Sequence, residues 1–114
     1  MAPGEQKSRS AQTRQQERRD RYAQVAGQRL REAPGCQFAL LPYHELVRIS
    51  AGWYDACAEA MLRANFLPID AWVGENARVA AEQGFELADL LELLRLCRGA
   101  AIEKEGWNED LFAE

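Results

Sequence analysis

The sequence has few of the residues on which most catalytic sites depend. His44 is the single histidine in 114 residues, so a Ser-His or Cys-His pair would rest on it alone. "HELVR" differs from the zinc-protease motif HExxH because its fifth position is Arg48. The chain also has no GxGxxG, no P-loop and no serine in a nucleophile elbow. These absences predict that the protein is not an enzyme and holds no cofactor.

Cysteines and long apolar runs are equally scarce. The three cysteines, Cys36, Cys57 and Cys97, are odd in number and form no CxxC pair, so we expect buried thiols instead of a disulfide framework or a zinc site. The longest apolar stretches are a few residues, far short of the roughly 20 that span a bilayer. The N-terminus has no apolar segment of the kind found in signal peptides. We therefore expect a cytoplasmic protein with no membrane contact.

Acidic residues are plentiful, but their spacing indicates no metal site. Pairs such as Glu82 with Glu86 and Asp89 with Glu92 fall mostly on the expected outer faces of helices. A metal or glycosidase site needs carboxylates that converge in a cleft. A solvated surface is the simpler interpretation.

Charge is unevenly distributed along the chain. Residues 1–33 carry eight Lys or Arg against four acids, whereas residues 34–114 carry six against fourteen. Residues 1–20 are rich in Gln, Arg and Ser, which predicts a basic, polar tail or a solvated helical extension before a helical domain over 21–114. Such an arm is solvated, folds onto the acidic body or onto a partner copy, or contacts nucleic acid.

Apolar spacing of three and four residues predicts helices throughout. The expected helices run from about Tyr22 to the break at "EAPGC", from Pro42 to about Asn65, over 69–83, and from the leucine-rich stretch to about Glu105. Gly84 is the expected left-handed cap of the third, with Phe85 making the accompanying apolar contact. No alternation typical of strands occurs. We predict an all-α bundle of four to five helices, with the third and fourth as an antiparallel hairpin and "GWNEDLFAE" as a short fifth element.

The fourth helix has more apolar surface than one neighbour can cover. On a helical wheel its apolar residues spread over roughly 240°, against the stripe of about 100° of a surface helix. Either it lies at the centre of the bundle, or one flank packs on the core and the other meets a second molecule. We favour a homodimer. The expected interface residues are Leu90, Leu93, Leu96, Cys97 and Ala100.

Polar side chains interrupt the apolar faces of the third and fourth helices. Asn76, Gln83 and Arg98 would lie in shared interior, with Arg95 on the adjacent flank. A buried guanidinium without a partner costs several kcal/mol, so Arg98 needs partners or must reach the edge of the bundle. We expect either a structural polar network or a site for an anion or a partner's carboxylate.

The stretch "ARVAAEQGFELADLLELLRLCRGAAIE", from Ala77 to Glu103, resembles the N-terminal helical domain of the RsbT co-antagonists, also called the RsbRD-type domain. That family has a charged helix ending in glycine, followed by a helix of pattern xLxxLLxxxRxxR. The matching residues here are Gly84, Leu87, Leu90, Leu91, Arg95 and Arg98. The resemblance extends over about residues 40–105.

The resemblance implies an all-helical, often dimeric and non-catalytic regulatory domain of bacterial stress signalling, placed before an output module. No such module follows before Glu114, so the chain is either freestanding or the front piece of something longer. Together with the wide apolar face, this predicts a sensor or adapter that binds itself and a protein partner. The alternative is a nucleic-acid-associated protein that uses the basic arm, namely Lys7, Arg9, Arg14, Arg18, Arg19 and Arg21.

Overall fold

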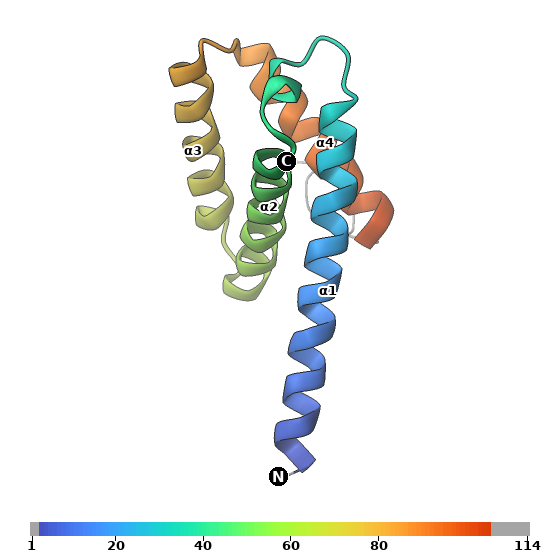
Figure 1. The fold of residues 1–114 in the computed structure, drawn as a ribbon. Coiled ribbons are helices and arrows are strands. Elements are labelled where there is room, and N and C mark those ends of the chain that lie inside the picture. The colour runs from blue at the N-terminus through green and yellow to red at the C-terminus, as the bar shows by residue number, and fades with distance from the viewer. Residues whose placement is uncertain (1–2, 106–114) are drawn as a thin grey trace.

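The computed structural model describes the backbone of residues 3–105 and the side chains of residues 13–101. Over that range the chain is all-α, as the sequence predicted, with no strand (Figure 1). The elements are α1 (Pro3–Arg31), the short 3-10 helix η1 (Gln37–Leu40), α2 (Tyr43–Arg63), α3 (Leu67–Gln83) and α4 (Leu87–Glu105). The expected fifth element around Trp107 and Leu111 lies outside the described residues.

Helices α1 and α2 form the most extensive helix pair. Gly27 of α1 lets the two backbones come close, since a Cβ at this position would lie 3.1 Å from Val47 Cγ2 of α2. Buried residues of α1, such as Tyr22 and Leu30, pack with Leu46 of α2 in one continuous core. Helix α3 packs against α2, and α4 packs against both α1 and α2.

The third and fourth helices reach the core from different sides. Trp72 of α3 stacks edge-on against Trp53 of α2, with ring centroids 5.0 Å apart, and donates its indole N–H to the Ile49 carbonyl at 3.0 Å. After the turn at Gly84, α4 runs back diagonally across α1 and α2 (Figure 1). Within residues 3–105 no helix is long and apolar enough to cross a membrane.

Helix α1 continues well beyond the bundle, so the N-terminal half of a 29-residue helix projects from one end (Figure 1). The segment expected as a tail or a helical extension is thus helical from Pro3. Near the base of the projection, Arg19 makes a two-pronged ion pair with Asp55 of α2, at 2.7 and 2.9 Å. This partly exposed contact joins the base of the projection to α2.

Two helix ends use left-handed backbone, and the sequence revealed one of them. Gly84 caps α3 at φ 73°, and the Phe85 N–H donates to the Ala80 carbonyl at 2.8 Å, as expected for this cap. Phe85 also packs edge-on against Phe38 of η1. The end of α2 repeats the geometry without glycine, since Ala64 has φ 55°. An L-residue is strained there.

These caps predict opposite effects for opposite substitutions. Ala64→Gly should raise the free energy of unfolding by about 0.5 kcal/mol, because relief of the left-handed strain exceeds the extra backbone entropy of glycine. Gly84→Ala should lower it by about 1 kcal/mol through backbone strain alone, since a Cβ at Gly84 would meet no atom within 4 Å. Urea unfolding monitored by circular dichroism measures both. Destabilisation by both variants would contradict the strain at Ala64.

Candidate interaction surfaces

The residues expected to bind a second molecule are in fact core residues of a single chain. Leu93, Cys97 and Ala100 have no exposed surface, and Leu90 is buried as well. Leu96 is half-buried and packs against the same core. These residues face α1 and α2, because α4 crosses both helices. The sequence-based assignment of this face to an interface was therefore wrong.

The surplus apolar surface of α4 lies on another flank. Leu87 is 71% exposed and Leu91 is 57% exposed, whereas Leu94 is half-buried. Spacings of four and three residues place all three on one side of the helix. We call Leu87 and Leu91 the α4 ridge. The wide apolar face is thus divided between a buried side and an exposed side, and the exposed residues differ from those the wheel assigned to an interface.

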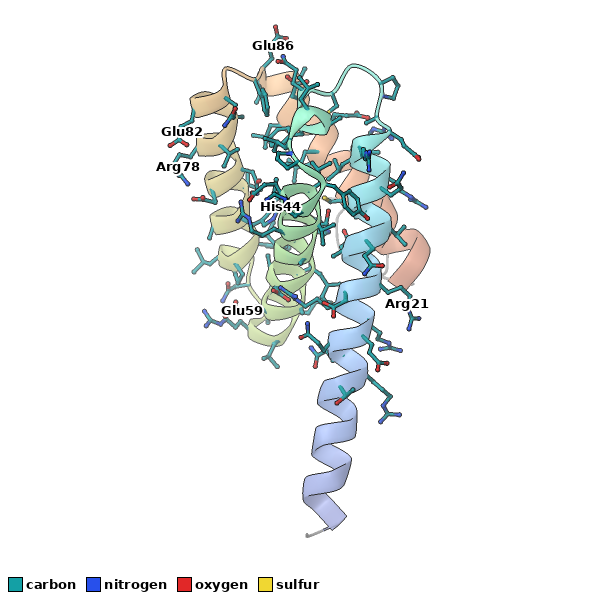
Figure 2. The ribbon with its side chains drawn as sticks, viewed as in Figure 1. Arg21, His44, Glu59, Arg78, Glu82 and Glu86 are labelled. Atoms are coloured by element: carbon teal, nitrogen blue, oxygen red, sulfur yellow. The ribbon has the colours of Figure 1, made fainter. Side chains whose placement is uncertain are left out.

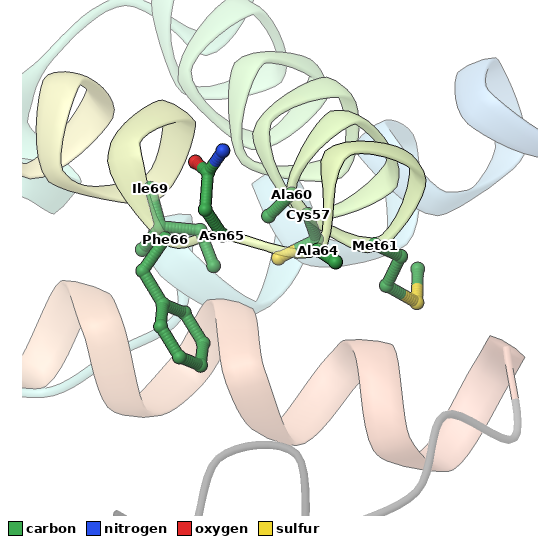
Figure 3. Close-up of a pocket in the computed structure, with 7 residues that line it drawn as sticks. All are labelled: Cys57, Ala60, Met61, Ala64, Asn65, Phe66 and Ile69. Atoms are coloured by element: carbon green, nitrogen blue, oxygen red, sulfur yellow. The ribbon is translucent and has the colours of Figure 1, made fainter.

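A second apolar surface lies where α2 passes into α3, as a pocket of about 330 Å³ (Figure 3). We call it the corner groove. Its lining residues are Cys57, Ala60, Met61, Ala64, Asn65, Phe66 and Ile69. Met61 and Phe66 are 47% and 60% exposed, and the Phe66 ring projects toward the side along which α4 runs. The residues beyond the lining, Leu62 and Leu67, are also exposed.

The groove has the chemistry of a binding surface and lacks an activated nucleophile. Its one reactive group is the Cys57 thiol, and burial raises the pKa of that thiol to about 12. Burial likewise raises the pKa of Cys97 to about 12. Both thiols are therefore neutral at physiological pH, whereas nucleophilic cysteines need a lowered pKa. The flexible side chain of Met61 suits a surface that adapts to an apolar ligand.

Other candidates for chemistry are dispersed. His44 is exposed and lies 3.6 Å from Glu45, the residue that follows it. Among the described residues no group of three or more His, Cys, Asp or Glu side chains could hold a metal ion. Two of the three acids of α3, Glu75 and Glu82, are engaged on the same helix, since Arg78 pairs with both.

The polar residues expected between the third and fourth helices lie in different environments. Asn76 is buried, but it donates to the Trp72 carbonyl of its own helix at 2.9 Å. Gln83 is exposed at the end of α3. Arg95 is exposed and donates to Glu92, one turn earlier on α4, at 2.9 Å. Arg98 is half-buried. Of the three residues expected in shared interior, Asn76 is buried, Arg98 is half-buried and Gln83 is at the surface, so that expectation was wrong for Gln83.

The buried polar cluster is instead built around Asp89. This residue was grouped with Glu92 among acids expected mostly on solvated faces, and for Asp89 that expectation was wrong. Asp89 is buried in the first turn of α4 and accepts the Glu86 N–H at 2.9 Å, which caps the helix. It also accepts the backbone N–H and the side-chain N–H of Gln37, at 3.0 and 3.1 Å. One carboxylate thus joins η1 to the start of α4. It thereby fixes the part of α4 that carries the ridge.

Exposed arginines form a row on the projecting part of α1. Arg14, Arg18 and Arg21 are exposed on one side of α1, toward the end of the bundle where α2 meets α3. No acid among the described side chains pairs with them. Glu86 lies at the opposite end of the bundle, next to the α4 ridge (Figure 2). Both ends also carry charges of the opposite sign, since Glu59 lies near the α2–α3 end and Arg78 lies toward the other end (Figure 2).

The Asp89 cluster predicts an acid-sensitive contribution to stability. Hydrogen bonds from the backbone of Gln37, and then of Glu86, hold the pKa of Asp89 below its ordinary 3.8. The stabilisation is complete above that ordinary value and is lost as pH falls through the lower pKa of the folded state. Asp89→Asn should lower the melting temperature by about 5 °C at pH 7, and this difference should shrink below pH 4.

The control is Asp70→Asn, which removes an exposed carboxylate from the first turn of α3. We expect a smaller effect from it. A penalty for Asp89→Asn that stayed constant from pH 7 to pH 2.5 would contradict the role of the ionised carboxylate.

Comparison with family models, curated proteins and solved structures gives no match to this chain. The resemblance of residues 77–103 to the RsbT co-antagonist domain therefore stays a hypothesis from the sequence. The accessible features that bear on function are the α4 ridge, the corner groove and the exposed arginines of α1.

Proposed function

We propose that this protein is a non-catalytic regulatory or adapter domain that acts by binding proteins, including a second copy of itself. The observation that carries this proposal is the clustering of exposed large apolar side chains at the α4 ridge and the corner groove. Exposed apolar surface of this kind, bordered by polar residues, is typical of binding sites for proteins. Among residues 13–101, the thiols of Cys57 and Cys97 are neutral and no cluster of His, Cys, Asp or Glu could hold a metal ion.

A role in bacterial signalling is supported by the resemblance of the leucine-rich segment to the RsbT co-antagonist domain. That likeness concerns the helix that carries the ridge, since Leu87 and Leu91 belong to its pattern. A sensor or adapter needs a surface that a partner can occupy. The structure leaves part of the leucine pattern accessible and buries the rest in the core.

Protein binding through these surfaces can be tested by comparative capture. Tagged protein is purified from native cells in three forms: unchanged, with Phe66→Glu and Leu91→Glu combined, and with Leu62→Glu alone. We expect a defined set of proteins with the unchanged chain, its loss with the double variant, and its retention with Leu62→Glu, because Leu62 does not line the groove. Identical capture by all three forms would contradict the proposal.

A second candidate function is binding of nucleic acid by the projecting half of α1. The observation in its favour is the row of exposed Arg14, Arg18 and Arg21, at spacings of four and three, outside the bundle and without acidic partners among the described residues. Such a row can follow a phosphate backbone. The acidic body, with fourteen acids against six Lys or Arg over residues 34–114, opposes it.

Salt dependence tests this alternative. Three phosphate contacts predict that log Kobs falls with log salt at a slope of about −3. Fluorescence anisotropy with labelled duplex DNA and single-stranded RNA measures it, and replacing all three arginines by glutamine should abolish the binding. The control is Arg48→Gln, which removes a cation from α2. Equal affinity of the triple variant and the control would exclude the arginine row as a nucleic-acid site.

A further inference from the structure

We infer that the base of the projecting part of α1 forms, with α2, a binding site for a small phosphate monoester of the sugar-phosphate class. This goes beyond the proposed function, because the site lies on neither the α4 ridge nor the corner groove. Two hollows make up the site, of about 410 and 510 Å³. Gln15 of α1 and Tyr54 of α2 line both of them. The hollows therefore adjoin, and one small ligand can occupy both.

The first hollow offers two guanidinium groups and no carboxylate. Its lining residues are Arg14, Gln15, Arg18 and Tyr54. Arg14 and Arg18 lie four residues apart, so they are on the same side of α1, where like charges repel each other. No acidic side chain among the described residues pairs with either of them. A bound anion would replace this repulsion with two attractive contacts.

The charge and the hydrogen-bond donors of the first hollow match a phosphate monoester better than a carboxylate. A phosphate monoester carries close to two negative charges at pH 7 and has three terminal oxygens that accept hydrogen bonds. Each guanidinium can donate two parallel N–H groups to such oxygens, and the Gln15 amide can donate to another. A carboxylate has a single charge, which one arginine satisfies. Two arginines and an amide together therefore favour phosphate.

The second hollow is polar and carries no net charge. Its lining residues are Gln15, Gln16, Arg19, Tyr54 and Asp55. The two charged residues already pair with each other, since Arg19 donates to both carboxylate oxygens of Asp55, at 2.7 and 2.9 Å. Side-chain amides and carboxylate oxygens are suitable partners for hydroxyl groups. This hollow suits an uncharged, hydroxyl-rich body attached to the phosphate, which is why a sugar phosphate is assigned in preference to free phosphate.

The floor of the site is held in place by the core of the bundle. Tyr54 is only 6% exposed, and its ring centroid lies 5.5 Å from that of Tyr22. Tyr22 in turn donates its hydroxyl to the Cys97 carbonyl of α4, at 2.7 Å. The ion pair described above joins the two helices that form the walls. The backbone of the site is thus set before a ligand arrives, and binding has to order only exposed side chains.

The experiment is an NMR titration of the full, 15N-labelled chain with three probes, namely ribose 5-phosphate, inorganic phosphate and ribose. Ribose 5-phosphate should bind saturably, with a dissociation constant of about 1 mM or below. It should shift the amide signals of residues 14–19 and 54–55. Inorganic phosphate should bind more weakly, because it leaves the second hollow unfilled. Ribose should not bind, because it has no charge for the two arginines.

Substitutions in the two hollows should have different effects. Arg14→Gln and Arg18→Gln should each weaken binding of ribose 5-phosphate by about tenfold, as expected for the loss of a charge-assisted hydrogen bond. Arg18→Lys keeps the charge without the planar fork, so its affinity should be intermediate. Gln16→Ala should weaken binding of ribose 5-phosphate by about threefold and leave inorganic phosphate unaffected, because Gln16 lines only the second hollow.

The matched control is Arg21→Gln, which removes an exposed cation from the same helix without changing the lining of either hollow. It should alter the affinity by less than about twofold at physiological salt, where distant charges are screened. Glutamine is as good a helix former as arginine, so all these variants should keep their helicity, which circular dichroism checks.

Three results would overturn the inference. The first is the absence of saturable binding of ribose 5-phosphate up to about 20 mM. The second is an equal loss from Arg21→Gln and Arg18→Gln, which would assign the effect to the general charge of the α1 arginines. The third is a phosphoserine peptide that binds the same arginines more tightly than ribose 5-phosphate, since the ligand would then be a modified protein.

The site and the proposed function can fail independently. Phe66→Glu and Leu91→Glu change the corner groove and the α4 ridge, and both variants should bind ribose 5-phosphate like the unchanged protein. Loss of phosphate binding in Arg18→Gln should likewise leave protein capture through the groove and the ridge unaffected. A dependence of ribose 5-phosphate binding on Phe66 or Leu91 would contradict the placement of the site between α1 and α2.

Discussion

The hydrogen bond from the Tyr22 hydroxyl to the Cys97 carbonyl, at 2.7 Å, joins the first helix to the last in the interior of the molecule. A buried phenol needs a polar partner, and a helix carbonyl presents one only at a particular rotation of that helix. The bond therefore fixes which face of α4 turns inward. With Leu93, Cys97 and Ala100 facing inward, the leucines at 87 and 91 remain outside. The exposure of the α4 ridge therefore follows from the rotation of α4 about its own axis.

The helices and two of their boundaries were accessible from the sequence because they depend on local physics. Spacing of apolar residues predicts a helix from its own residues, and Pro42 and Gly84 mark ends through their restricted or permissive φ. The end of α2 was predicted at about Asn65, and the helix ends at Arg63. The residue in left-handed conformation there is Ala64, so no glycine marks the boundary in the sequence. There the following turn, with the Asn65 N–H donating to the Ala60 carbonyl at 3.2 Å, imposes the conformation from outside the residue.

The residues of the candidate surface were harder to predict, because rotation of a helix about its axis is set by contacts distant in sequence. A wheel with apolar residues over most of its circumference fits several rotations equally well. For the same reason the burial of the polar residues could not be predicted. Gln83 and Arg95 are exposed, whereas Asp89 is buried. Asp89 finds its partners on η1, fifty-two residues away in the sequence. No local pattern contains that contact.

A small domain cannot place every apolar side chain inside, and the choice of those left outside carries information. The polar projection of α1 adds little to the core, so the remaining helices share a modest interior. An exposed leucine replaced by a polar residue would cost the fold almost nothing, because it buries little surface there. Leucines and a phenylalanine nevertheless occupy such positions at both ends of the bundle. Under the proposed function, a bound partner would cover these side chains, and each would then contribute its hydrophobic free energy to association.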